Sequence, residues 1–368
     1  MPVLSENNVF LPERQVKDVP DYSLNATVAK ARTLYGKRLS VDDYKELLKK
    51  TSISEIADYL KRETHFSECM SNIDINTVHR GYLEEILNRE TLEEYARLCK
   101  FQNLASIDFF NYRVIINEIS AIVRCVTFIN AGRSEEFLNT IPTYLIQHAS
   151  FDMMKLAESR TYGEMLEALR KTPYYEILKN EKIDEDGNYD CTGIDTKLRA
   201  YYVNWVTTAV SKNFHGKDRK ELLDIINILY DLTNVYNAFR FKAFSCAGED
   251  EISEHLLPVR SRMSPMKKKE LLEAENAEAY VEALSDTGFG RQMSEANPEM
   301  NRMTLQYDIL RLKSKYAKLY LRRTTSPAVS IYTILFLLSA EVKNITTIIE
   351  GVRYGVPQQE IEKLLIIV

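Results

Sequence analysis

Residues 331–345 read Ile-Tyr-Thr-Ile-Leu-Phe-Leu-Leu-Ser-Ala-Glu-Val-Lys-Asn-Ile, an apolar stretch that ends on an acid, Glu341, and on Asn344. The same ending occurs twice more, beginning at Glu118 and at Asp231: an acid, two residues, Asn or Ala, then Ile or Val. Apolar residues lie nearly all round these stretches, so we expect them to form central helices and not surface helices. An ionised acid inside such a helix costs several kcal/mol unless it is paired and hydrogen-bonded, on an order-of-magnitude scale.

A second marker precedes each acid. Ser40, Ser150 and Ser264 each open a segment that is typical of a Ser-capped helix, a polar break and a second amphipathic helix. The acids follow these serines by 78, 81 and 77 residues. Two independent markers therefore keep one spacing in three copies of a unit of about 110 residues. Each second helix ends at Thr-x-aromatic, as Thr64-His-Phe66, Thr172-Pro-Tyr174 and Thr287-Gly-Phe289.

The length of the unit decides the expected architecture. A unit of about 110 residues can hold its own small core, whereas solenoid units of about 20 to 50 residues cannot. We predict an all-α fold of three pseudo-threefold-related repeats that form a funnel or bowl; three helical domains in a line are the alternative. The predicted divisions are an N-terminal arm at 1–21 and repeats at 22–140, 141–259 and 260–368.

Composition agrees with long helices and excludes several classes of protein. Only 12 Gly and 10 Pro occur in 368 residues, which disfavours a loop-rich β protein. The net charge of −5, from 48 basic and 53 acidic residues, gives no global attraction to nucleic acid. Five scattered cysteines without a Cys-x-x-Cys motif indicate a reducing, cytoplasmic setting. The most apolar run, 331–340, is half the roughly 20 residues that a membrane span needs, so we expect none.

The acids and the asparagines that follow them share helix faces. Asp231 and Asn234, like Glu341 and Asn344, are three residues apart, so the amide could orient the carboxylate while a basic residue neutralises it. Arg240 lies nine residues after Asp231 and therefore on the opposite face of the helix. Any cation that pairs with Asp231 must then come from another helix.

The acids could act as general bases or proton carriers, or they could each pin a helix junction within their unit. Three similar acids at a regular spacing favour the structural role, because catalytic groups usually differ in role. The five histidines form no Glu-x-x-His or His-Glu-x-x-His motif, and neither a phosphate-binding loop nor a Gly-x-Ser-x-Gly motif occurs. We therefore predict no catalytic residue, no cofactor and no metal ligand.

Three stretches resemble the C-type subunits of the prokaryotic A/V-type ATP synthases, the counterparts of the d-type subunits of eukaryotic V-ATPases. They are residues 22–32 leading into Leu39-Ser40, the element Tyr-Asp-Leu-Thr-Asn-Val-Tyr-Asn-Ala-Phe-Arg-Phe-Lys at 230–242, and residues 341–361. The likeness extends over nearly the whole chain. The residues that carry the repeat and the family motif are Glu118, Asp231, Asn234, Arg240, Lys242, Glu341, Asn344, Gly351, Gly355 and Pro357.

The resemblance implies a funnel of three helical units and a non-catalytic role in the central stalk of a rotary ATPase. Such a subunit sits between the proteolipid rotor ring and the central shaft of D- and F-type subunits, and transmits torque between ATP turnover and ion transport. It is cytoplasmic, peripheral on the cytoplasmic face of the membrane, and binds neither nucleotide nor nucleic acid. The alternatives are a soluble helical scaffold or adaptor unrelated to membranes, and a helical enzyme centred on Asp231 and Glu341.

Overall fold

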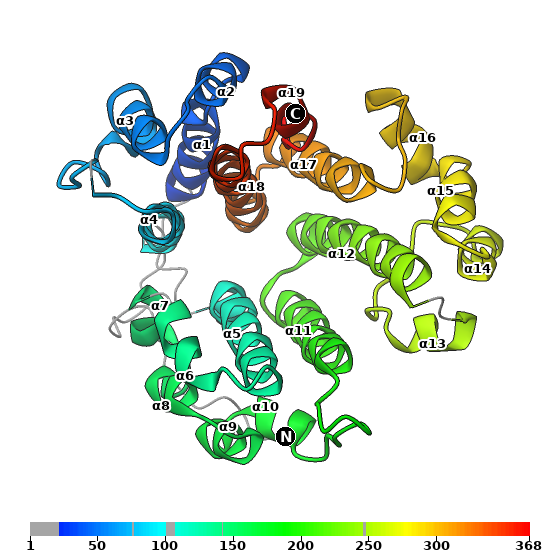
Figure 1. Ribbon diagram of the computed structural model, residues 1–368. Helices are drawn as coiled ribbons and strands as arrows, with labels where there is room; N and C mark the ends of the chain where they lie inside the picture. The colour runs from blue at the N-terminus through cyan, green and yellow to red at the C-terminus, as the bar shows by residue number, and fades with distance from the viewer. Residues whose placement is uncertain (1–21, 76, 101–106, 142, 246–247) are drawn as a thin grey trace. The chain divides into compact units, whose positions relative to one another are not determined.

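The computed structural model describes residues 22–75, 77–100, 107–141, 143–245 and 248–368; the predicted arm at 1–21 lies outside them (Figure 1). The described residues form helices joined by turns and contain no β-strand, only an isolated bridge between Ile183 and Tyr189. The predicted all-α class is confirmed. The described residues fall into two compact units.

Unit 1 holds the described residues of Asn103–His215 and His255–Val259. Its two long helices, α5 (Tyr112–Asn130) and α11 (Cys191–Asn213), pack against each other, and the shorter elements pack around them (Figure 1). Those elements are η3 (Asp108–Asn111), α6 (Ser134–Phe137), η4 (Leu138–Thr140), α7 (Thr143–His148), α8 (Met153–Glu158), α9 (Tyr162–Leu169) and α10 (Pro173–Leu178).

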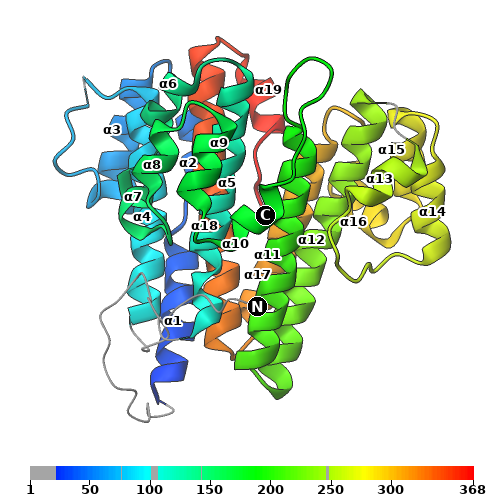
Figure 2. The ribbon, with the colours of Figure 1, turned by 90° about the horizontal axis from the view of Figure 1, so that it is seen from below.

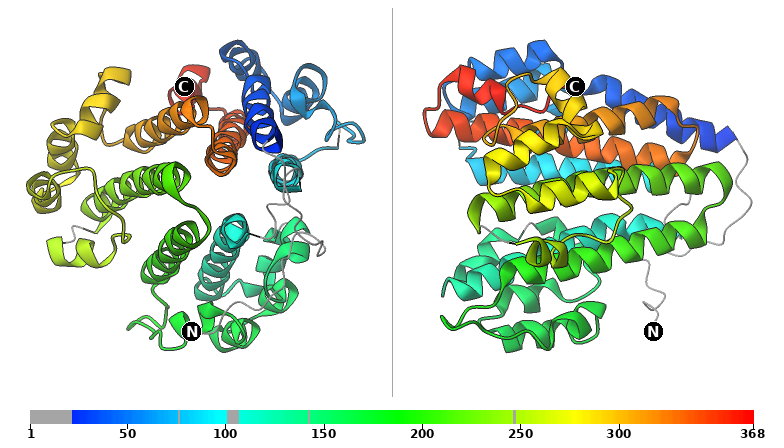
Figure 3. Two further views of the ribbon diagram at one scale, coloured as in Figure 1. Left: turned by 180° about the vertical axis from the view of Figure 1, so that it is seen from behind. Right: turned by 90° about the vertical axis from the view of Figure 1, so that its right-hand side faces the viewer.

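Unit 2 holds the described residues of Asp18–Gln102, Gly216–Glu254 and Arg260–Val368. Its long helices run beside one another (Figure 3): α1 (Tyr22–Lys37), α4 (Arg80–Lys100), α12 (Gly216–Phe244), α17 (Leu305–Arg323) and α18 (Pro327–Arg353). Four short helices gather on one side of α12 (Figure 2): α13 (Glu249–Glu254), α14 (Pro265–Glu273), α15 (Ala277–Ser285) and α16 (Gly288–Ala296). The others are α2 (Val41–Leu48), α3 (Ile53–Glu63), η1 (His65–Ser67) and α19 (Gln358–Lys363).

Helix α18 is the central helix of unit 2. It begins with Pro327 in its first turn, where the missing N–H costs nothing, and packs against α1, α4 and α17. The apolar run 331–340, from which we expected no membrane span, is only part of α18, which has 27 residues. Among the described helices, α18 is the one that is long and apolar enough to cross a membrane. Because 83% of its apolar window is buried inside the protein, its apolar faces form a protein core here.

The first and last segments of the described chain share that core. Side chains of α2, α3, η1 and α4 pack with Ile345 and Ile349 of α18 and with Ile361 of α19. Arg32 of α1 also forms hydrogen bonds with main-chain carbonyls at the end of α17. Its Nε donates to the carbonyl of Leu321 (3.2 Å), and its Nη2 donates to the carbonyls of Arg322 (3.0 Å) and Thr324 (2.8 Å). Those carbonyls have no partner within the helix, so the guanidinium satisfies them.

The predicted serine caps are confirmed at two of the three places. Ser40 caps α2 in a capping box with Asp43, and Ser264 caps α14 by accepting the N–H of Lys267. The prediction is wrong at Ser150, because Asp152 caps α8 instead. Asp152 directly precedes the first helical residue, and its carboxylate accepts the N–H groups of Met154 and Lys155.

The predicted pair of short helices before a Thr-x-aromatic end recurs in all three places. The pairs are α2 and α3, α8 and α9, and α14 and α15. The threonines Thr64, Thr172 and Thr287 occupy the N-cap positions of the next short helices, η1, α10 and α16. The local pattern therefore repeats three times. The funnel arrangement and the repeat boundaries stay predictions.

Candidate functional site

The three predicted acids are buried, each on a long helix. Glu118 of α5 and Asp231 of α12 are both 1% exposed, and Glu341 of α18 is 0% exposed. Each carboxylate accepts a main-chain N–H from a residue within two positions of a marker serine. The donors are Ser150 to Glu118, Arg262 to Asp231 and Leu39 to Glu341. The same arrangement, a buried carboxylate that accepts a main-chain N–H, therefore occurs three times. These three junctions form the candidate functional site.

Glu118 is held by neutral donors. Its Oε1 accepts the N–H of Ser150, and its Oε2 accepts the hydroxyl of Tyr174 at 2.6 Å. Burial raises the pKa of Glu118 above its ordinary value, and these hydrogen bonds only partly oppose the rise. Burial, and then the neighbouring carboxylate, also raise the pKa of Tyr174. Among the described residues no basic side chain forms an ion pair with Glu118.

Asp231 is bound by the turn that precedes α14. Its Oδ2 accepts the N–H of Arg262 at 2.7 Å, and the side chain of Ser261 adds a further hydrogen bond. Burial raises the pKa of Asp231, while these bonds and nearby positive charges lower it by less. The guanidinium of Arg262 pairs instead with Asp224 at 2.8 Å. The partner of Asp231 comes from outside α12, as predicted, but it is a main-chain amide and not a cation.

Glu341 differs from the other two because basic side chains approach it. Its Oε1 accepts the N–H of Leu39 at 2.6 Å, and its Oε2 lies 3.0 Å from Nε2 of His65. The Nε of Arg38 is 3.9 Å from Oε1, at the outer limit of an ion pair. This carboxylate therefore joins α18 to Leu39, which lies shortly before α2, and to His65 of η1.

The Thr-x-aromatic segments supply the second partner in two of the three junctions. Tyr174 lies 24 residues after Ser150, and His65 lies 25 residues after Ser40. Sequence reasoning treated these segments as helix ends and missed this role. Tyr174 is the aromatic residue of its segment, whereas His65 is the residue between the threonine and the aromatic, so no single position of the motif signalled this role. In the third copy Gly288 and Phe289 occupy these two places, and neither has a polar side chain.

Each bond links segments that lie on opposite sides of a predicted boundary. Glu118 falls in 22–140 and Ser150 in 141–259, while Glu341 falls in 260–368 and Leu39 in 22–140. The acid therefore secures the start of the following segment, and the last acid secures the start of the first. At the predicted repeat boundaries each acid thus joins one repeat to the next, whereas the sequence suggested a junction within a single repeat.

Asn344 binds the end of the chain, whereas the sequence suggested that it would orient the carboxylate of Glu341. Asn344 is fully buried; its Nδ2 donates to the carbonyl of Ile366 (3.0 Å) and its Oδ1 accepts that residue's N–H (2.7 Å). Both ends of the amide are thus used to hold the last residues against α18. On α12, Asn234 is partly buried, Arg240 is exposed and Lys242 is buried. The exposure of Arg240 agrees with its predicted placement opposite Asp231.

Gly351, Gly355 and Pro357 shape the turn from α18 into α19. Gly355 adopts φ +65°, a left-handed conformation that favours glycine after a helix end. A Cβ on Gly351 would lie 2.4 Å from Cδ1 of Ile361, so only glycine allows α19 to pack this closely. Pro357 is the N-cap residue of α19. The three residues therefore direct the chain back onto α18.

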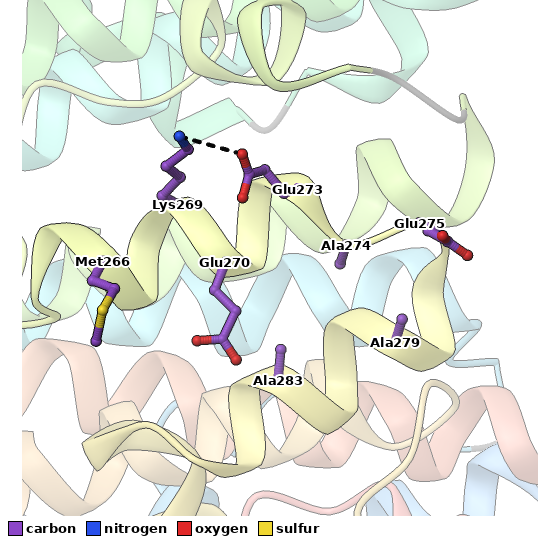
Figure 4. Close-up of a pocket in the computed structure, with 8 residues that line it drawn as sticks. All are labelled: Met266, Lys269, Glu270, Glu273, Ala274, Glu275, Ala279 and Ala283. Atoms are coloured by element: carbon purple, nitrogen blue, oxygen red, sulfur yellow. Dashed lines mark ion pairs between the residues drawn. The ribbon is translucent and has the colours of Figure 1, made fainter.

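Two hollows open on unit 2. One, of about 590 Å³, lies at α14 and α15, with Ala279 and Ala283 on α15 and Glu270 on α14 (Figure 4). Beside it Lys269 pairs with Glu273 at 3.4 Å. The other, of about 1010 Å³, lies along α17. Within the described part of the chain, no group of three His, Cys, Asp or Glu residues could hold a metal ion.

Comparison with known proteins gives one consistent result. The family model described as ATP synthase (C/AC39) subunit matches residues 27–364. The C subunit of the A-type ATP synthase of Methanosarcina mazei is 24% identical, over 93% of this chain and 92% of that protein. The protein of the same name from Archaeoglobus fulgidus is 23% identical over 92% and 95%. That from Methanocaldococcus jannaschii is 22% identical over 88% and 82%.

Proposed function

The chain belongs to the ATP synthase (C/AC39) subunit family, and on that premise we propose that it couples the membrane rotor ring to the central shaft of an A/V-type ATPase. The observation that carries the proposal is the extent of the family match. Residues 27–364 include all three acid-bearing helices and all three turns that those acids hold. The whole connecting framework therefore falls within the match.

The junctions fit a part that transmits torque. A coupling protein must pass a twisting load between two partners without yielding, and close-packed helical cores transmit strain well. Each buried carboxylate ties a long helix to a turn that begins the next helical segment. A buried carboxylate has no water to replace a lost donor, so these ties resist local opening.

The same geometry supports a role without catalysis. The carboxylates of Glu118 and Asp231 accept hydrogen bonds from main-chain N–H groups, and that of Glu118 also from the hydroxyl of Tyr174. In this proposal the protein has no active site, binds no nucleotide and requires no cofactor. The motif residues from Glu118 to Pro357 act by holding helices and turns together.

The proposal extends to assembly and location. Three repeats, at 22–140, 141–259 and 260–368, form a funnel with one end on the proteolipid ring. Its cavity receives the tip of the D- and F-type shaft. The protein is peripheral on the cytoplasmic face of the membrane. The burial of α18 inside unit 2 supports this location, since its apolar surface is already covered by protein.

A bridging assay tests the proposal against the scaffold alternative. The full chain, tagged, is mixed with purified rotor ring in detergent, with the isolated D–F shaft, and with both. We expect it to retain each partner alone and to bring ring and shaft together in one complex that does not form without it. If the folded chain retains neither ring nor shaft, the coupling role is rejected and a scaffold unrelated to membranes is favoured.

A further inference from the structure

The larger hollow, which we call the α17 groove, lies along α17 and is bounded by α16 and by α19 with the last residues of the chain. Figures 1 and 3 show α16 and α19 on opposite sides of α17. All of it belongs to unit 2, and none of its lining residues takes part in the carboxylate junctions. The carboxylate junctions therefore do not account for the residues that line this groove.

Three cations in the α17 groove lack an acidic partner. Lys315, Lys318 and Arg322 lie three and seven residues apart on α17 and so share one side of the helix. Within the described residues none of them forms an ion pair. Seven residues of helix rise by about 10 Å, so the three charges form a row two turns long.

All the other charged side chains that line the groove, except Glu299, form ion pairs with one another. Arg311 pairs with Asp308 at 2.8 Å and donates to the carbonyl of Leu365, and Lys363 pairs with Glu360 at 2.8 Å. Glu299 is the remaining lining acid and is exposed. Five basic and three acidic side chains therefore line the groove, a net charge of +2 on a chain whose net charge is −5. This local excess is unmatched within the protein.

An apolar strip accompanies the row of charges. Leu312 and Leu319 lie seven residues apart on α17, with Leu312 buried at the floor and Leu319 partly buried. Met303 at the groove is 75% exposed, and Val368 is 37% exposed. Exposed apolar side chains around a recessed floor are typical of grooves that receive an amphipathic helix.

We propose that the α17 groove binds an amphipathic helix of a partner protein, with leucine-like residues on one face and Glu or Asp at three- to four-residue spacing beside them. The acids pair with Lys315, Lys318 and Arg322, and the apolar face covers Leu312 and Leu319. An anionic membrane offers the same charge but cannot follow a concave surface down to a buried floor. The inference goes beyond the coupling role, because binding of such a helix does not depend on contact with ring or shaft.

Peptide binding to the full chain tests the inference. The probe is a fluorescein-labelled peptide of about 18 residues, built from Leu and Ala with Glu at the stated spacing. Its matched peptide has Gln in place of every Glu. We expect the acidic peptide to bind at least tenfold more tightly than the Gln peptide, and its binding to weaken as salt screens the charges. Equal affinity for the two peptides would refute the proposal.

Charge reversal locates the binding. The triple variant Lys315→Glu, Lys318→Glu, Arg322→Glu is expected to bind the acidic peptide at least tenfold more weakly. The control, Lys155→Glu, Lys171→Glu, Lys182→Glu, changes the net charge equally at exposed positions of unit 1 and is expected to bind normally. A Gln version of the groove triple, with its melting temperature measured, separates lost binding from lost folding. Unchanged peptide binding in a folded groove variant would overturn the inference.

Two further outcomes would also overturn it. Vesicles containing phosphatidylserine are offered to the same proteins. If charge reversal in the groove removes vesicle binding while leaving peptide binding intact, the three cations bind an anionic membrane and not a helix.

In the assembled complex, a photo-crosslinker is placed at Met303 or, as control, at Met266, which is also 75% exposed but lies at the other hollow. The Met303 product must map to a segment with acids along one helical face; a product without them contradicts the proposal.

Discussion

The carboxylate of Glu118 has two neutral donors and no charged partner in the described structure. Removing it leaves a buried amide and a buried hydroxyl without an acceptor, which is more costly than the net value of the bonds. We expect Glu118→Ala to lower the free energy of unfolding by about 2–4 kcal/mol and Tyr174→Phe by about 1–2 kcal/mol. Urea denaturation followed by circular dichroism measures both. Glu185→Ala, in an exposed turn, is the control and is expected to leave the stability unchanged.

The raised pKa of Glu118 predicts how its contribution changes with pH. Because the folded-state pKa lies above the ordinary value of 4.5, the folded chain holds this proton more tightly than the unfolded chain does. The resulting stabilisation is complete below about pH 4.5 and is lost as pH rises through the folded-state pKa. Glu118→Gln cannot titrate, so wild-type stability is expected to fall relative to this variant as pH rises above about 4.5. A stability difference that stays constant with pH would contradict the prediction.

At the scale of single residues, the sequence identified the acids but not their partners. The regular spacing and apolar surroundings of Glu118, Asp231 and Glu341 were enough to predict their burial. The sequence could not predict which main-chain N–H groups bind these acids. Every residue except proline carries such a donor, and only the fold determines which of them lies next to the carboxylate. The Glu341–Leu39 bond joins residues 302 apart, a separation over which no helical period carries information.

Among the elements, the turn between α18 and α19 offers a test of close packing. We expect Gly351→Ala to destabilise the protein by about 1–3 kcal/mol, because its Cβ would overlap the side chain of Ile361. In the double variant with Ile361→Ala the added methyl gains space, so the two effects should be less than additive. Thermal unfolding of the four proteins of this cycle measures the coupling.

Gly163→Ala is the matched control for that cycle. Gly163 is exposed on α9, has nothing near its Cβ position and lies inside a helix, so alanine is expected to be neutral or slightly stabilising there. Additive effects of Gly351→Ala and Ile361→Ala would show that the two side chains do not compete for one space.

Helix boundaries were predictable where local chemistry decides them. Ser40 and Ser264 directly precede the first residues of α2 and α14, and both cap as predicted. In the second copy Asp152, which lies closer to the first helical residue than Ser150 does, forms the cap. The full length of α18 could not be predicted from its apolar pattern alone. Glu341 and Lys343 interrupt its apolar pattern, but packing against α1, α4 and α17 continues the helix.

For the whole molecule, helical class and family membership followed from the sequence, whereas the way its segments combine did not. A repeat found by spacing shows that similar segments exist, but not which of them pack together. In unit 2 the first helices share a core with α18 and α19, so segments from the two ends of the described chain stabilise each other. This combination depends on side-chain shape and solvent exclusion, which hydrophobic periodicity does not specify.

In its proposed role this protein transmits torque without performing chemistry. The most direct measurement is ATP-driven ion pumping by the reconstituted complex in sealed vesicles, with and without this chain, alongside ATP hydrolysis in the same samples. We predict that complexes lacking the chain still hydrolyse ATP but do not pump, and that adding the chain back restores pumping. Pumping that persists at the full ratio of ions to ATP in its absence would contradict the coupling role.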